Sequence, residues 1–118
     1  MLNTTTRLAA ILAIGQQQAN AFTAFARAEA AKSSGDYRAA RPVYEHYVAE
    51  ARTFLEATLA FNREFPDSPY DVPPVAQPLV NALMVCADIV DGVGARDAAG
   101  RMRQQAREVA RTDLGPDA

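Results

Sequence analysis

The sequence predicts an all-α protein, a four-helix arrangement built on a long antiparallel helical hairpin. Three observations lead to this class. Apolar residues recur at alternating steps of three and four from Tyr37 to Phe65, the spacing of one helix face. Good helix formers dominate the 118 residues, and Trp is absent. Only segment 66–74 is rich in proline. The stripe comprises Tyr37, Ala40, Tyr44, Tyr47, Ala51, Phe54, Thr58, Phe61 and Phe65.

The first predicted helix covers residues 4–34. Asn3 or one of the threonines that follow it can cap its start. Gly35 can end it in the left-handed conformation. Its apolar stripe is expected to form the buried face of the helix. That stripe consists of Leu8, Ile11, Leu12, Gly15, Ala19, Phe22, and Phe25 or Ala26.

The second predicted helix covers residues 41–65 and carries the aromatic stripe. A proline is tolerated in the first turn of a helix, whereas deeper inside it removes a hydrogen bond and clashes with the preceding turn. Pro42 therefore favours a helix that begins near Arg41; a helix that begins earlier and kinks at Pro42 is the alternative. Burying each large side chain contributes about 1.5–3 kcal/mol, so the stripe must lie against helices of this chain or of a second copy.

The third predicted helix, 75–91, is apolar almost all round between Leu79 and Val90. Such a helix is usually central, or covered on a second side by a partner. A glycine-containing link leads to the fourth predicted helix, 96–112, and a frayed tail over 115–118. We expect the last two helices to pack across the hairpin, within a single domain, 1–118.

A short segment at the predicted hairpin turn resembles the second half of a tetratricopeptide repeat. It is similar as well to the helical hairpin of microtubule-interacting-and-trafficking domains. The matching residues, within about ten positions, are Gly35, Asp36, Tyr37, Ala40 and Tyr44. Ala24 and Arg27 stand where a tetratricopeptide repeat has large apolar residues, and Pro42 falls inside its second helix. The resemblance implies a helix-turn-helix packing that can leave a groove for a peptide.

Composition narrows the compartment and the partners. A formal net charge of −2 gives no long-range attraction for nucleic acid or an anionic membrane. Cys86 is the single cysteine, which excludes an intramolecular disulfide and predicts a buried, inert thiol in a reducing cytoplasm. A signal peptide cleaved at Ala21 is the alternative, although only one basic residue precedes its apolar run. We expect no apolar run to approach the roughly 20 residues of a membrane span.

Two sets of polar residues could form a site. His46 and Glu50 lie four apart on a helix and could bind a metal with Asp88, Asp91 or Glu29. One histidine is too few for a di-metal bundle, so a solvated helix flank is the simpler interpretation and no metal or cofactor is predicted. Four arginines within an arc of about 80° could contact phosphates or an acidic partner, or form salt bridges on an exposed face. They are Arg96, Arg103, Arg107 and Arg111.

These features favour a non-enzymatic helical protein–protein interaction or adaptor module whose partner is a second copy or another protein. The residues expected to contact that partner are the four arginines together with Tyr44, Tyr47, Phe54 and Phe61. The alternative is a small-ligand-binding regulatory protein, with an aromatic pocket between the second and third helices that could include Tyr70. Catalysis ranks below both, because no nucleophile has a recognisable base nearby. Nucleic-acid binding ranks below both as well.

Overall fold

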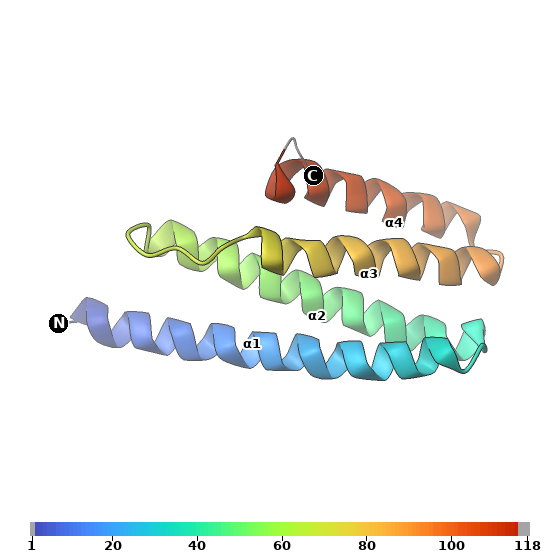
Figure 1. Ribbon diagram of the computed structural model, residues 1–118, viewed down its shortest axis with the longest axis horizontal. Coiled ribbons are helices and arrows are strands. Elements are labelled where there is room, and N and C mark those ends of the chain that lie inside the picture. The colour runs from blue at the N-terminus through green and yellow to red at the C-terminus, as the bar shows by residue number, and fades with distance from the viewer. Residues whose placement is uncertain (1, 116–118) are drawn as a thin grey trace.

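Four helices make up almost the whole of the computed structural model, which describes residues 2–115. Helix α1 covers Leu2–Ser33, α2 Tyr37–Glu64, α3 Pro73–Gly92 and α4 Arg96–Val109, and a short π-helical segment, η1, covers Ala110–Leu114 (Figure 1). The predicted all-α class and the long α1–α2 hairpin are confirmed. Most of the predicted frayed tail, residues 116–118, lies outside the described residues.

The helices lie side by side in one layer, in chain order (Figure 1). Helix α1 packs on α2 alone, and α3 lies between α2 and α4. The molecule measures 54 × 30 × 18 Å and is longest along the helices. The predicted packing of the last two helices against the hairpin holds for α3, which contacts α2, and not for α4, which contacts α3 instead. A single layer leaves both of its faces, and the outer side of α1, uncovered by this chain.

Helix α1 contacts α2 through small side chains. Ile14, Ala24 and Ala28 are its buried residues. With half-buried residues between them they form the inner seam, which has heptad spacing: Ala10, Ile14, Gln17, Ala21, Ala24, Ala28 and Ala31. The predicted buried stripe of α1 is wrong, since all of its members except Ile11 are exposed. Alanines fit against the large rings of α2, where a second row of large side chains would overfill the interface.

Helix α2 begins at Tyr37, earlier than predicted, with Pro42 inside it. The side chain of Asp36 accepts a hydrogen bond from the backbone N–H of Ala39 at 3.1 Å and caps the helix. Ala40 in this first stretch is fully buried. The cap and the buried alanine hold residues 37–41 helical against the hydrogen bond that Pro42 removes.

The proline-rich loop, residues 65–72, is fixed to α2 by one asparagine. The side chain of Asn62 donates to the carbonyl of Tyr70 at 3.0 Å and accepts from its backbone N–H at 2.8 Å. The ring of Phe61 contacts those of Phe65 and Tyr70, at centroid distances of 4.8 and 4.9 Å. The loop is therefore packed against the C-terminal end of α2.

Helix α3 is the central element of the core. Leu79, Leu83, Cys86 and Val90 are at most 1% exposed, between α2 and α4. Contrary to the prediction that no run would suffice, α3 is long and apolar enough to cross a membrane by length and composition. The central helix of a folded domain has the same composition, and the burial of α3 on two sides accounts for it here.

Candidate interaction surface

The aromatic stripe of α2 is largely satisfied within the chain. Tyr44, Tyr47 and Phe61 are 1, 5 and 4% exposed, and Phe54 is half-buried. The ring of Tyr47 lies 5.3 Å from that of Phe25 on α1 and 5.7 Å from that of Tyr44. The four residues of α2 that were predicted to contact a partner thus lie in the core or at its edge. Only Phe54 retains substantial exposed area.

An open groove of about 530 Å³ runs between α1 and α3, with α2 as its floor. The predicted aromatic pocket corresponds to this groove, except that α1 supplies one wall and Tyr70 lies elsewhere, against Phe61. Apolar side chains make up most of its surface. The groove is open because α1 and α3 are not packed against each other. Its principal lining residues are Phe22, Phe25, Tyr44, Tyr47, Phe54, Val75, Pro78 and Val85.

One carboxylate interrupts this apolar lining. Glu29 lines the groove and pairs with Lys32 at 2.8 Å on the same helix. Burial raises the pKa of Tyr44 and Tyr47, and the nearby negative charge of Glu29 raises the pKa of both further. The phenols therefore stay neutral at physiological pH. The groove can bind an apolar body and offers hydrogen-bonding groups at the end nearest Glu29.

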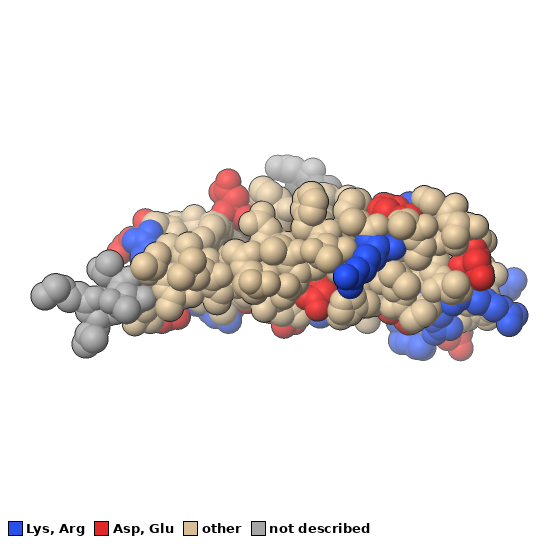
Figure 2. Space-filling view, turned by 90° about the horizontal axis from the view of Figure 1, so that it is seen from below, with Lys and Arg blue, Asp and Glu red and all other residues tan. Residues whose placement is uncertain are grey.

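The side of α1 that faces away from α2 carries a second heptad-spaced row of residues, all of them exposed. We call this row the outer seam: Leu8, Leu12, Gly15, Ala19, Phe22 and Ala26. Leu8, Leu12 and Phe22 are 56, 67 and 74% exposed. At 100° per residue, the outer seam lies about 170° from the inner seam. Figure 2 views this side of the molecule, and uncharged residues dominate the coloured surface from beside the grey N-terminal atoms to beyond the middle.

The arginines of the last helix do not act as one group. Arg103 bridges to α3, at 2.9 Å from Asp88 and 3.5 Å from Asp91. Arg107 donates to Gln104 at 2.7 Å, on its own helix. Arg96 and Arg111 are exposed, the second of them in η1. One arginine thus fastens α4 to α3, and the others form a polar face diluted by acidic neighbours.

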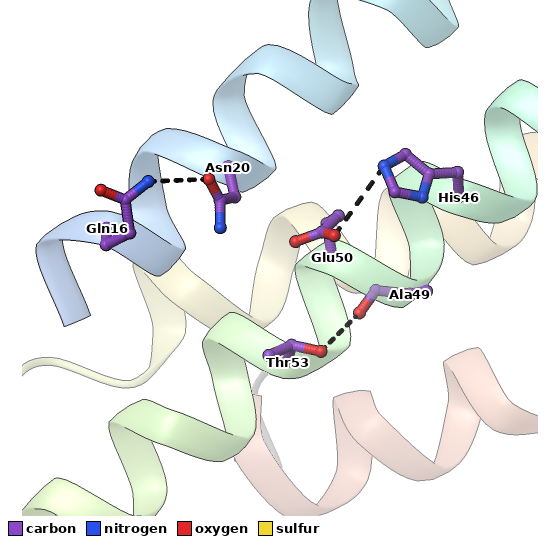
Figure 3. Close-up of polar contacts among 6 residues, drawn as sticks. All are labelled: Gln16, Asn20, His46, Ala49, Glu50 and Thr53. Carbon is purple, nitrogen blue, oxygen red and sulfur yellow. Dashed lines mark hydrogen bonds and ion pairs between the residues drawn. The ribbon is translucent and has the colours of Figure 1, made fainter. Parts of the chain in front are cut away.

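His46 lies on an exposed flank of α2. Its Nε2 is 3.8 Å from Oε1 of Glu50, and the histidine side chain is 59% exposed. In Figure 3, this pair and the Gln16–Asn20 hydrogen bond each stay within one helix. Asp88 and Asp91 pair with Arg103 instead. Among residues 2–115, no group of three His, Cys, Asp or Glu side chains is placed to bind a metal.

Cys86 lies in the centre of α3 and is fully buried. Burial raises the pKa of its thiol to about 11, which keeps it protonated and unreactive at neutral pH.

Sequence reasoning missed the outer seam as an exposed surface. The signal was present: the 19 residues between Arg7 and Arg27 carry no charge, so both sides of this part of α1 are suited to burial. Of the two rows in that stretch, the prediction buries the one with the larger side chains, whereas the structure exposes it. The chain matches no known family, no characterised protein and no solved structure. The function must therefore be inferred from the surface itself.

Proposed function

We propose that this protein is a non-enzymatic helical interaction module that associates with itself or with another protein through α1 and the adjacent groove. The observation that carries the proposal is the exposure of Leu8, Leu12 and Phe22 in one row. Scattered exposed apolar residues are normal, whereas a contiguous apolar patch marks an interaction site. The groove extends this patch from Phe22 towards α3.

The chemistry of the remaining surface is consistent with this proposal. His46, the single histidine of the chain, lies exposed on α2 beside Glu50. The buried, protonated thiol of Cys86 is unsuited to nucleophilic catalysis and suits a reducing compartment, which we propose is the cytoplasm. The expected partner is therefore a protein surface with matching apolar side chains.

Light scattering after size exclusion, on the untagged chain from low to high micromolar concentration, tests the proposal. We expect the apparent mass to rise towards that of a dimer. The double variant Leu12→Ser, Phe22→Ser should remain monomeric and bind less of a hydrophobic dye, because both side chains are exposed in the monomer. A wild-type chain that stays monomeric, and binds no more dye than the variant, would contradict the proposal.

The groove supports a second candidate function, the binding of a small apolar ligand. Its volume of about 530 Å³ falls within the usual range for ligand sites, about 300–1,000 Å³. Nile red should gain fluorescence on binding there, and Val85→Trp should reduce the gain by filling the groove. Val80→Trp is the matched control, since Val80 is also half-buried on α3 and does not line the groove. Equal dye binding by both variants would exclude the groove as the site.

A further inference from the structure

The outer seam of α1 matches itself when it is reversed. If a two-fold axis crosses α1 level with Gln17, Leu12 of one copy faces Phe22 of the other. The same axis places Leu8 opposite Ala26 and Gly15 opposite Ala19. Small residues therefore meet at the centre, while a leucine meets a phenylalanine on either side of it. A two-fold interface requires this reciprocity, since each contact occurs twice.

Charge is also compatible with this arrangement. The 19 residues from Leu8 to Ala26 carry no charge, so two copies can pair along them without burying or opposing a charge. Arg7, at one end, donates a hydrogen bond to Ser68 of the proline-rich loop and is thereby directed towards its own chain. Figure 2 shows the uncharged surface along this side of the molecule.

The available area suits a weak, reversible interface. Nineteen helical residues extend about 28 Å, and one helix with its side chains is about 10–12 Å wide. This gives about 300 Å² on each copy, or about 600 Å² for the pair, the size of a weak, transient association. An interface of this size indicates a dimer that dissociates on dilution.

Gly15 allows a close neighbour at this level of α1. A glycine inside a helix destabilises it, and a Cβ added at Gly15 would meet nothing within 4 Å. No contact in this chain therefore requires the glycine. A second helix that crosses α1 at this level would account for it, because the absence of a side chain allows two helix backbones to approach closely.

We propose that a second copy of this chain covers the outer seam, with the two α1 helices antiparallel and crossing at Gly15 and Ala19. This inference rests on the proposed self-association and adds its surface, orientation and register. The pair forms a continuous layer of eight helices, α4 to α1 of one copy followed by α1 to α4 of the other.

The seam is tested by placing one charge in it. Ala19→Glu should raise the dimer dissociation constant at least about tenfold, because two carboxylates would be buried near the axis. Ala9→Glu is the matched control: Ala9 is an exposed alanine of the same helix outside the outer seam. Both substitutions introduce a good helix former at an exposed position, so both monomers should fold alike by circular dichroism. If both variants weaken the dimer equally, or if neither weakens it, the outer seam is not the dimer interface.

The register is tested by disulfide trapping. Chains with Gly15→Cys and chains with Ala19→Cys are mixed and oxidised; Cys86 stays in place because it is fully buried. The antiparallel register predicts crosslinks between the two variants in preference to crosslinks within either. Crosslinks within each variant alone would indicate parallel helices and overturn the orientation. A wild-type dimer that yields neither kind of crosslink would overturn the seam and leave the interaction function standing. A strict monomer in light scattering would overturn the second copy as the partner of the outer seam, while the interaction function would still depend on the dye measurement.

Discussion

Helices α1 and α3 are both rich in apolar residues, but they are covered to very different extents. Helix α3 has neighbours on two sides and buries eight of its 20 residues. Helix α1 has 32 residues and one neighbour. Among the described side chains of α1, only Ile14, Ala24 and Ala28 are buried. Helix α3 is the more apolar of the two, and their positions in the fold separate them further: an outer helix leaves the side opposite its neighbour to solvent or to a partner.

The largest expected effect comes from truncating a leucine in each helix. Leu83→Ala, in α3, should lower the free energy of unfolding by about 2–5 kcal/mol, because Leu83 is 1% exposed and leaves a cavity. Leu12→Ala, in α1, should change it by less than about 0.5 kcal/mol in the monomer, because Leu12 is 67% exposed. Urea denaturation at low protein concentration measures both. Similar losses would mean that α1 is covered within the chain.

The dependence of stability on alkaline pH tests whether three ionisable side chains of α2 and α3 are buried in the native state. Burial raises the pKa of Cys86 from 9.0 to about 11 and the pKa of Tyr44 and Tyr47 above 10.0. The unfolded chain therefore loses these protons first. Their stabilising contribution is complete below about pH 9 and declines as the pH rises, by at most about 1.4 kcal/mol per pH unit for each group.

Urea unfolding between pH 8 and 11 measures this decline. Tyr44→Phe should make it shallower by removing one of the three groups, whereas Leu12→Ala should leave it unchanged. A free energy of unfolding that stays constant up to pH 11 would show that these side chains are not protected from solvent in the native state.

A smaller effect is expected where the start of α2 meets the end of α3. A Cβ added at Gly92 would lie 2.6 Å from Cδ2 of Tyr37, which is too close. Gly92→Ala should therefore cost about 1 kcal/mol, as the half-exposed ring moves aside. The cost should disappear when Tyr37→Ala is introduced as well, which a double-mutant cycle of thermal or urea unfolding would detect. If Gly92→Ala lowers the free energy of unfolding by the same amount in the Tyr37→Ala variant, the strain arises in the backbone and not from the contact with the Tyr37 ring.

Much of the fold was predictable because the signals were local. The Asp36 cap, the left-handed Gly35 and the prolines at 66–74 each specify a chain reversal through their own backbone chemistry. The helix start at Tyr37 was not predictable from Pro42 alone, because the burial of Ala40, a tertiary contact, helps to keep that turn helical.

The candidate surface was less predictable for the same reason. On α1 the pattern contains two heptad rows, and choosing which one packs on α2 requires knowledge of the facing rings. The larger row, with Leu12 and Phe22, is the more hydrophobic of the two, and the sequence pattern alone therefore favours it as the core. The alanine row packs on α2 instead, because the large side chains at this interface are Tyr44 and Tyr47 of α2.

The smallest expected effect is a gain in stability. Gly15→Ala should stabilise the monomer by about 0.5–1 kcal/mol, since alanine is the better helix former and the site is open. Gly100→Ala is the matched control: Gly100 lies inside α4, is exposed and is equally open. In dilute protein the two gains, measured by urea unfolding, should agree. In concentrated protein only the gain at Gly15 should shrink, because there the added methyl group meets the second α1. If the two gains in unfolding free energy stay equal at every protein concentration, Gly15 lies outside any interface and that side of α1 is exposed to solvent.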